Sequence, residues 1–145
     1  SELVNNKPIY NITFCQRVDG ALDHDRLNFA LTELVKKHPI LISEFFMDDN
    51  KINTKVNSTF IPSIKFINKI CHDDEILQLA KAQNNIIFDL SNAPLFRVSL
   101  INSNNISFII VTVHHIIFDA GSIDIFIKDL SDFYNNELNA PQSIA

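Results

Sequence analysis

Glycine, cysteine and tryptophan are scarce or absent: the 145 residues contain two glycines, two cysteines and no tryptophan. Neither glycine lies in a Gly-x-Gly-x-x-Gly or Gly-x-x-x-x-Gly-Lys pattern, so the sequence gives no support for a nucleotide-binding loop. A chain with so little glycine has few backbone positions that tolerate positive φ. We therefore expect both glycines, Gly20 and Gly121, to lie in sharp turns.

The two cysteines, Cys15 and Cys71, form no Cys-x-x-Cys pair and have no histidines at the spacing of zinc ligands. No metal site is therefore expected. Nothing in the sequence pairs the two thiols, and free, reduced cysteines are typical of a cytoplasmic protein.

A basic surface and a long apolar run are also lacking. The formal charge is −5, and no basic stripe is available to neutralise phosphates, which argues against a nucleic-acid partner. No run approaches the roughly 18 apolar residues of a membrane-spanning helix, so no membrane partner is expected. With 46% hydrophobic residues, the chain is instead expected to form one domain around a single core.

Hydrophobic periodicity predicts alternating strands and helices, and hence one α/β domain. Strands are predicted over residues 10–18, 41–47, 52–56, 64–67, 95–101 and 106–113. Helices are predicted from the cap Asp23 to just before Pro39, over 73–82, and from Ser122 onward. The turn at 48–50 joins two of the strands into a hairpin.

Segment 113–122 places polar side chains at the abrupt end of an apolar strand. Residues 106–113 form a nearly continuous β-branched and aromatic run, typical of a strand buried on both faces, and the run stops at His114 and His115. From Ser122, the expected N-cap, apolar residues recur at helical spacing. The sequence thus predicts a strand, a tight turn that contains Gly121, and a helix.

Strand geometry limits what the two histidines can do together. Adjacent strand residues point to opposite faces, so His114 and His115 are not expected to share a metal ion. One histidine is expected to be buried and structural, and the other to face a cavity where its neutral imidazole accepts a proton. Asp119, beyond the turn, can orient a ring or pair with a cation. The plainer alternative is a polar strand end without catalytic function.

Four segments, in the same order, resemble condensation domains of nonribosomal peptide synthetases, which belong to the chloramphenicol acetyltransferase-like acyltransferases. Residues 114–119, His-His-Ile-Ile-Phe-Asp, fit the first six positions of the family motif HHxxxDG. The other segments are 9–23, similar to the family's first strand and turn; 37–41, similar to Arg-His-x-x-Leu; and 88–98, similar to Phe-Asp-Leu followed by Pro-Leu-x-Arg. Together they cover nearly the whole chain.

The resemblance implies a fold and a reaction. The fold is a two-layer sandwich with a mixed, largely antiparallel sheet and helices on one side. Residues 1–145 are expected to be the N-terminal lobe of a two-lobed domain, incomplete at both ends. The reaction forms a peptide bond between aminoacyl or peptidyl thioesters, held on the phosphopantetheine of carrier proteins. His115 would be catalytic, His114, Asp119 and Gly121 would support the motif, and the chain itself would bind no cofactor.

Three departures from the family pattern count against activity. Ala120 replaces the motif glycine, with Gly121 one position later. Ile42 stands where the family often has an arginine, a candidate partner for the motif aspartate, which leaves Arg97 as a weaker substitute. The chain is expected to hold only the first lobe, so the tunnel wall of the missing second lobe would be absent and the isolated chain inactive.

Two alternatives from other functional classes stay open. A degenerate or excised lobe could serve as a non-catalytic docking surface for a carrier or partner domain, which Ala120 and Ile42 favour. His114-x4-Asp119 also has the spacing of glycerolipid O-acyltransferases, in which histidine deprotonates a hydroxyl group. The acidic charge balance and the lack of an anchor argue against that third function.

Overall fold

The computed structural model describes residues 11–144, and side chains within residues 11–136. Its elements, in chain order, are β1 (Asn11–Asp19), α1 (His24–Lys37), the short 3-10 helix η2 (Pro39–Ile42), β2 (Ser43–Asp48), β3 (Lys51–Val56), β4 (Lys65–Asn68), α2 (Asp73–Asn84), β5 (Phe96–Ser103), β6 (Ile106–His114), the 3-10 helix η3 (His115–Ile117) and α3 (Ala120–Ile144). No helix in this described part is long and apolar enough to cross a bilayer.

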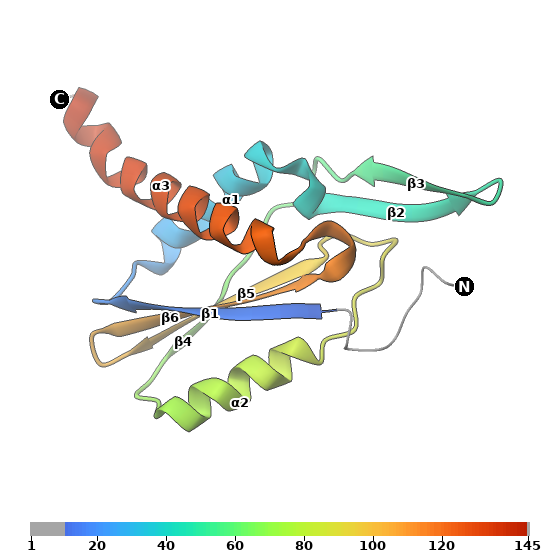
Figure 1. The fold of residues 1–145 in the computed structure, drawn as a ribbon. Helices are drawn as coiled ribbons and strands as arrows, with labels where there is room; N and C mark the ends of the chain where they lie inside the picture. Colours follow the sequence, from blue (N-terminus) through green and yellow to red (C-terminus); the bar gives the residue numbers. More distant parts are fainter. Residues whose placement is uncertain (1–10, 145) are drawn as a thin grey trace.

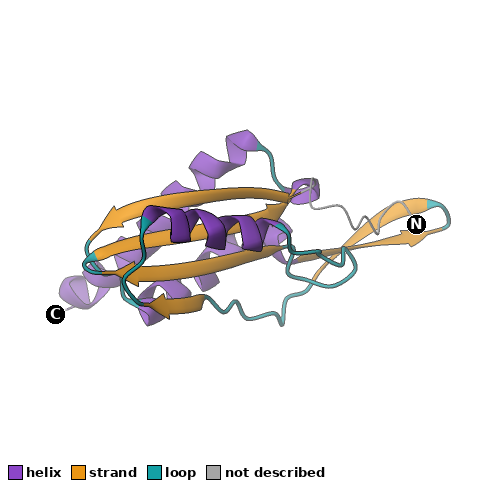
Figure 2. Cartoon of the chain, turned by 90° about the horizontal axis from the view of Figure 1, so that it is seen from below, coloured by secondary structure: helices purple, strands orange, loops and turns teal. Residues whose placement is uncertain are grey.

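Four strands form the main sheet in the order β1-β6-β5-β4. β6 pairs antiparallel with both β1 and β5, whereas β4 joins β5 in parallel. β2 and β3 form a separate antiparallel hairpin, which extends away from the main sheet (Figures 1 and 2). The expected mixed, largely antiparallel sheet and the expected hairpin are therefore confirmed.

The helices lie on both faces of the main sheet, so the expectation of helices on one side was wrong for α2. α1 and α3 pack together over one face, and α2 covers the other (Figure 1). β6 explains why: Ile109 and Val111 belong to the large core under α1 and α3, whereas Ile110 packs with Ile76 of α2. A strand that is apolar on both faces needs cover on both.

Helix α1 follows its sequence pattern closely. The Asp23 carboxylate accepts a hydrogen bond from the Arg26 backbone N–H at 2.9 Å, which caps the first turn. Its apolar residues recur at helical spacing on one face, and that face is buried in full: Leu27, Ala30, Leu31, Leu34 and Val35. The helix ends at Lys37, and Pro39 opens η2 rather than extending α1.

Tight turns join the strands where the sequence offers residues that tolerate positive φ. Asp49 and Asn50 (φ 49° and 62°) close the β2–β3 hairpin, and Asn104 and Asn105 (φ 48° and 64°) close β5–β6. Gly20 has φ 97°, as expected for a glycine that ends a strand. The predicted start of β2 was wrong: Leu41 and Ile42 lie in η2, so β2 starts at Ser43.

Candidate active site at the end of strand β6

The two histidines of the motif differ in exposure, as strand geometry predicted. His114 ends β6 and is buried, with 6% of its surface exposed, whereas His115 begins η3 and is exposed. The change from strand to 3-10 helix between these two residues carries His115 out of the sheet. The two imidazoles therefore have separate environments.

Hydrogen bonds and packing fix His114 at the end of β6. Its backbone N–H donates to the Leu95 carbonyl at 2.8 Å, and its Nδ1 accepts from the Ile116 backbone N–H at 3.0 Å. The ring meets Phe88 edge-on, with 6.5 Å between centroids. Burial, and next the neighbouring charge of His115, lower the pKa of His114, because both disfavour the imidazolium. The ring is therefore neutral at pH 7.

His115 has a defined tautomer. Its Nδ1 lies 2.8 Å from the Phe118 carbonyl oxygen. A carbonyl can only accept, so Nδ1 must carry the hydrogen and Nε2 of the neutral ring must carry the lone pair. The Phe118 backbone N–H returns a longer bond, 3.4 Å, to the His115 carbonyl. This short loop thus presents an exposed imidazole whose unprotonated nitrogen is Nε2.

Phe118, whose carbonyl selects this tautomer, lies in a cluster of three aromatic rings. The Phe118 ring stacks on Phe14 of β1 at 6.2 Å and meets Phe126 of α3 edge-on at 6.0 Å. Phe14 and Phe126 also meet edge-on, at 5.7 Å. Each ring of the cluster therefore contacts the other two, and the Phe118 carbonyl is held by packing from both the sheet and α3.

Asp119 caps helix α3, which corrects two expectations. Its Oδ1 accepts from the backbone N–H and the hydroxyl of Ser122, at 3.0 and 3.1 Å. Ser122, the predicted N-cap, lies inside the helix, which begins at Ala120. Gly121 is helical too and does not have positive φ, so it forms no sharp turn. Since Ala120 suits a helix start, the shifted glycine does not strain the backbone.

The departure at Ile42 changes the surroundings of Asp119. Ile42 is 6% exposed and belongs to the core, so it supplies no cation. Arg97, the substitute considered from the sequence, lines a groove between the sheet and α2 and forms no ion pair with Asp119. Among the residues the structure describes, no lysine or arginine lies within salt-bridge distance of Asp119.

The structure contains a buried ion-paired cluster that the sequence did not predict. Asp129 of α3 is 6% exposed; its Oδ2 lies 2.6 Å from His38 Nε2 and its Oδ1 3.1 Å from Lys37 Nζ. The hydrogen bond from His38, ahead of the other contacts, lowers the pKa of Asp129. The available signal was Asp129 itself, a charge three residues after Phe126 on the apolar stripe of α3.

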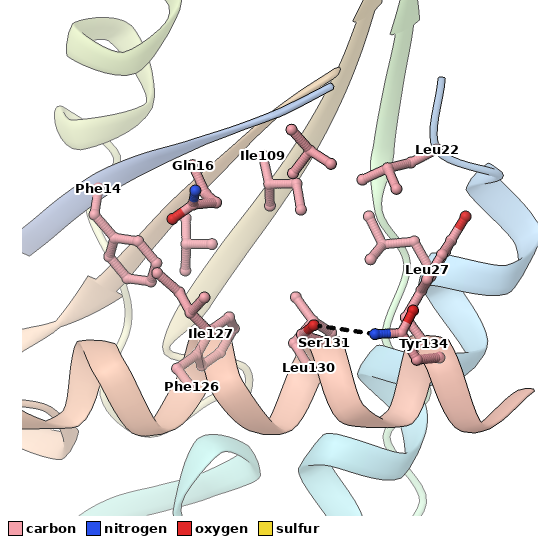
Figure 3. Close-up of a pocket in the computed structure, with 13 residues that line it drawn as sticks. Phe14, Gln16, Leu22, Leu27, Ile109, Phe126, Ile127, Leu130, Ser131 and Tyr134 are labelled. Atoms are coloured by element: carbon pink, nitrogen blue, oxygen red, sulfur yellow. Dashed lines mark hydrogen bonds between the residues drawn. The ribbon is translucent and has the colours of Figure 1, made fainter. Parts of the chain in front are cut away.

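A mostly apolar pocket lies elsewhere and is unsuited to acid–base chemistry. It has a volume of about 360 Å³ and lies between α3, α1 and strands β1 and β6 (Figure 3). Its lining is mostly apolar, with Phe14, Ile109 and Leu130 among its walls, and Tyr134 is its one titratable side chain. A smaller cleft of about 130 Å³, beside η3, is lined by His38, Phe118 and Ser122.

Neither metal nor disulfide chemistry is indicated within residues 11–136. No three His, Cys, Asp or Glu side chains of this part gather closely enough to hold a metal ion. Cys15 and Cys71 are both free.

Comparison with known proteins identifies the family. The condensation-domain family model matches residues 1–144. Bacitracin synthase 3 of Bacillus licheniformis is 30% identical over 138 residues, covering 93% of this chain and 2% of that protein. The bassianolide nonribosomal cyclodepsipeptide synthetase of Beauveria bassiana is 34% identical over 126 residues, covering 86% of this chain and 4% of that protein. The chain therefore belongs to the condensation-domain family.

The fold agrees with this assignment. The crystal structure of the first condensation domain of the CDA synthetase superposes with a TM-score of 0.83 at 21% identity, covering 92% of this chain and 36% of that one. The chloramphenicol acetyltransferase-like fold expected from the sequence is thereby confirmed. The chain spans about a third of the solved domain and a few per cent of the synthetases it matches.

Proposed function

We propose that residues 1–145 form the first lobe of a two-lobed condensation domain that makes a peptide bond between two carrier-bound thioesters. The amine of one aminoacyl group attacks the thioester carbonyl carbon of the other, the carbon–sulfur bond breaks, and the phosphopantetheine thiol leaves. The proton lost by the amine balances the proton gained by the thiolate. The observation that carries the proposal is the exposed His115 with its Nε2 lone pair.

The tautomer of His115 suits the demands of this reaction. A free amine is mostly protonated at pH 7, with a pKa of about 8 for an α-amino group, so the site must favour its neutral form. Nε2 accepts a hydrogen bond or proton from the amine, while Nδ1–H stays bound to the Phe118 carbonyl and stabilises the imidazolium. The same nitrogen then returns the proton to the leaving thiolate.

The other motif residues hold this imidazole in place. His114 anchors the end of β6 to Leu95, and Asp119 caps the helix that follows. Gly121 lies in the first turn of that helix, where an added Cβ would make an ordinary contact of 3.4 Å with the Asp119 Oδ1. These are positioning roles, and we assign catalysis to His115 alone.

The proposed partners follow from the same reaction. Carrier proteins deliver the substrates on phosphopantetheine arms, and the second lobe supplies the wall of the tunnel that faces His115. No cofactor is assigned to this chain. The free cysteines support a cytoplasmic location.

A non-catalytic docking role is the second candidate. It is favoured by the absence of a cationic partner for Asp119 among the described residues, because the family often has an arginine at the position of Ile42. The third candidate, glycerolipid acyl transfer by His114, is disfavoured. His114 is buried and its Nδ1 is already bound to the Ile116 N–H, so it is poorly placed to deprotonate a hydroxyl.

Turnover with loaded carrier proteins tests the proposal. The polypeptide that carries these residues in its source would be supplied with aminoacyl-loaded donor and acceptor carriers, and the dipeptidyl thioester followed by mass spectrometry. His115→Ala should lower the rate by about 10²–10⁴-fold. His72→Ala, at the N-cap of α2 on the other side of the sheet, serves as the matched control.

Two outcomes would contradict the proposal. An unchanged rate in His115→Ala would remove the catalytic role of the imidazole. Product formed by the 145-residue chain alone would show that no second lobe is needed.

A further inference from the structure

Asp129 is a carboxylate buried in the apolar face of helix α3. Phe126 and Leu130, on the same face, belong to the core. A buried carboxylate is strongly destabilising unless donors satisfy it. Here each oxygen has one: His38 Nε2 at 2.6 Å and Lys37 Nζ at 3.1 Å. Both donors come from the C-terminal end of α1, so Asp129 ties that end of α1 to α3.

His38 also lies beside the loop that carries His115. The cleft of about 130 Å³ is lined by His38 together with Ile117 and Phe118 of the η3 region and Phe126 of α3. His38 is partly exposed there, with 32% of its side-chain surface accessible, and only its Nε2 contacts Asp129. The His38 imidazole thus both contacts the buried carboxylate and lines the cleft beside η3.

Packing connects Asp129 to the His115 tautomer in two steps. Phe126 precedes Asp129 by about one helical turn, and its ring meets that of Phe118 at 6.0 Å. The Phe118 carbonyl accepts the Nδ1–H of His115. A shift of α3 against α1 therefore moves Phe126, then Phe118, and changes the acceptor that selects the Nδ1–H form.

This chain also lacks an ion pair between position 42, just after α1, and Asp119, just before α3. Ile42, in η2 directly after α1, is apolar and buried, and Asp119 has no ion pair with any described residue. Within the described residues, the ion pairs between α1 and α3 are those of Asp129 with Lys37 and His38.

We infer that His38 and Asp129 are a positioning pair for His115. They hold α3 against the end of α1 and, through Phe126 and Phe118, keep the neutral His115 imidazole in its Nδ1–H form. The catalytic consequence rests on the proposed function, but the positioning itself does not.

Imidazole ¹⁵N chemical shifts test the inference directly, because protonated and unprotonated ring nitrogens resonate far apart. They would be recorded on the 145-residue chain at a pH where the rings are neutral, with His115→Gln used to assign the resonances. In the wild type, His115 should show a protonated Nδ1 and an unprotonated Nε2. Asp129→Asn and His38→Leu should both shift it toward a mixture of the two tautomers.

Matched variants separate positioning from general damage. Asp132→Asn removes the same charge one turn later, from an exposed carboxylate paired with Lys128, and should leave the His115 resonances unchanged. His38→Gln keeps an N–H donor for Asp129 and should restore the wild-type shifts.

The inference is overturned if Asp129→Asn and His38→Leu fold and His115 keeps its resonances. If Asp129→Asn does not fold, His38→Leu decides alone; loss of folding in both would make the pair a stability element and overturn the positioning role. Because these spectra need no turnover, an inactive domain with shifted His115 tautomers would refute the proposed function and leave the pair in place.

Discussion

The Nδ1 of His115 donates a 2.8 Å hydrogen bond to the backbone carbonyl of Phe118, three residues away. This bond selects the tautomer of His115, because it determines which ring nitrogen keeps its lone pair. The side chain of Phe118 belongs to the core, with 7% of its surface exposed, so the carbonyl is as firmly placed as the aromatic cluster itself. Core packing and site chemistry therefore meet in one residue.

Replacement of Phe118 should be costly for folding. Phe118→Ala removes a buried ring that contacts Phe14 and Phe126, and should lower the free energy of unfolding by about 3–5 kcal/mol. Urea unfolding followed by circular dichroism measures the change. Phe29→Ala, at a phenylalanine that is 46% exposed on α1, should cost far less. Similar losses at both positions would show that the cluster contributes no special stability.

Asp119 should behave as a helix cap rather than as half of a salt bridge. Asp119→Ala removes the acceptor for the Ser122 N–H and should cost about 1 kcal/mol. Asp119→Asn keeps an acceptor oxygen and should cost little, at low and at high salt alike, because no described cation faces it. Thermal unfolding of both variants, with Asp124→Ala as the exposed control on the same helix, measures this. A large, salt-dependent loss in Asp119→Asn would reveal an ion pair.

Local patterns in the sequence were sufficient for much of the fold and for the division between the histidines. The α1 stripe from Leu27 to Val35 follows the 3.6-residue period, and a helix with one apolar face has one way to bury it. His114 and His115 were separable because neighbouring strand residues face opposite ways. Both predictions depend on periodicity, which the sequence records directly.

Other features depend on contacts between distant segments, which no local pattern records. The pairing of His38 with Asp129 joins residues 91 positions apart, so neither residue alone predicts it. The predicted start of α3 was wrong because Asp119 and Ser122 are both good N-cap residues. The η3 turn before them determines that Asp119 is the one that caps the helix. The two apolar faces of β6 also required cover on the second face of the sheet. The prediction of helices on one side did not take this requirement into account.

The two glycines should respond differently to alanine, since one has positive φ and the other is helical. Gly20→Ala forces a Cβ into a backbone with φ 97° and should cost about 1–2 kcal/mol. Gly121→Ala should change stability by less than about 0.5 kcal/mol, because the helix preference of alanine offsets a 3.4 Å contact with Asp119. Chemical denaturation of both variants measures this. A larger loss at Gly121 would show that the contact of the new Cβ with Asp119 outweighs the helix preference of alanine.

Asp129 should make folding stability depend on pH in the acidic range. Its pKa is lowered in the folded chain, mainly by His38, so its contribution is complete above its unfolded pKa of about 4 and is lost as pH falls through the folded value. In that window the unfolded chain binds more protons, and stability falls by up to about 1.4 kcal/mol per pH unit. Asp129→Asn should make the acidic limb of a stability–pH curve shallower. Asp132→Asn gives the reference for the loss of one exposed charge on the same helix, and an unchanged limb in Asp129→Asn would contradict the prediction.

Replacement of His115 should reduce turnover and leave carrier binding unchanged, and this difference distinguishes the catalytic role from the docking role. Binding of a carrier protein depends on a broad surface, of which a single imidazole is a small part, so His115→Ala should leave the Kd for a fluorescently labelled, phosphopantetheinylated carrier within about twofold of the wild type. Fluorescence anisotropy on the polypeptide that carries these residues measures the Kd, with His72→Ala as the control.

Unchanged binding together with lost turnover would support catalysis by His115. Unchanged binding with unchanged turnover, or with none in either protein, would favour the docking role. Weaker binding in His115→Ala alone would mean that the imidazole itself contacts the carrier arm, and would contradict the assignment of its function to proton transfer.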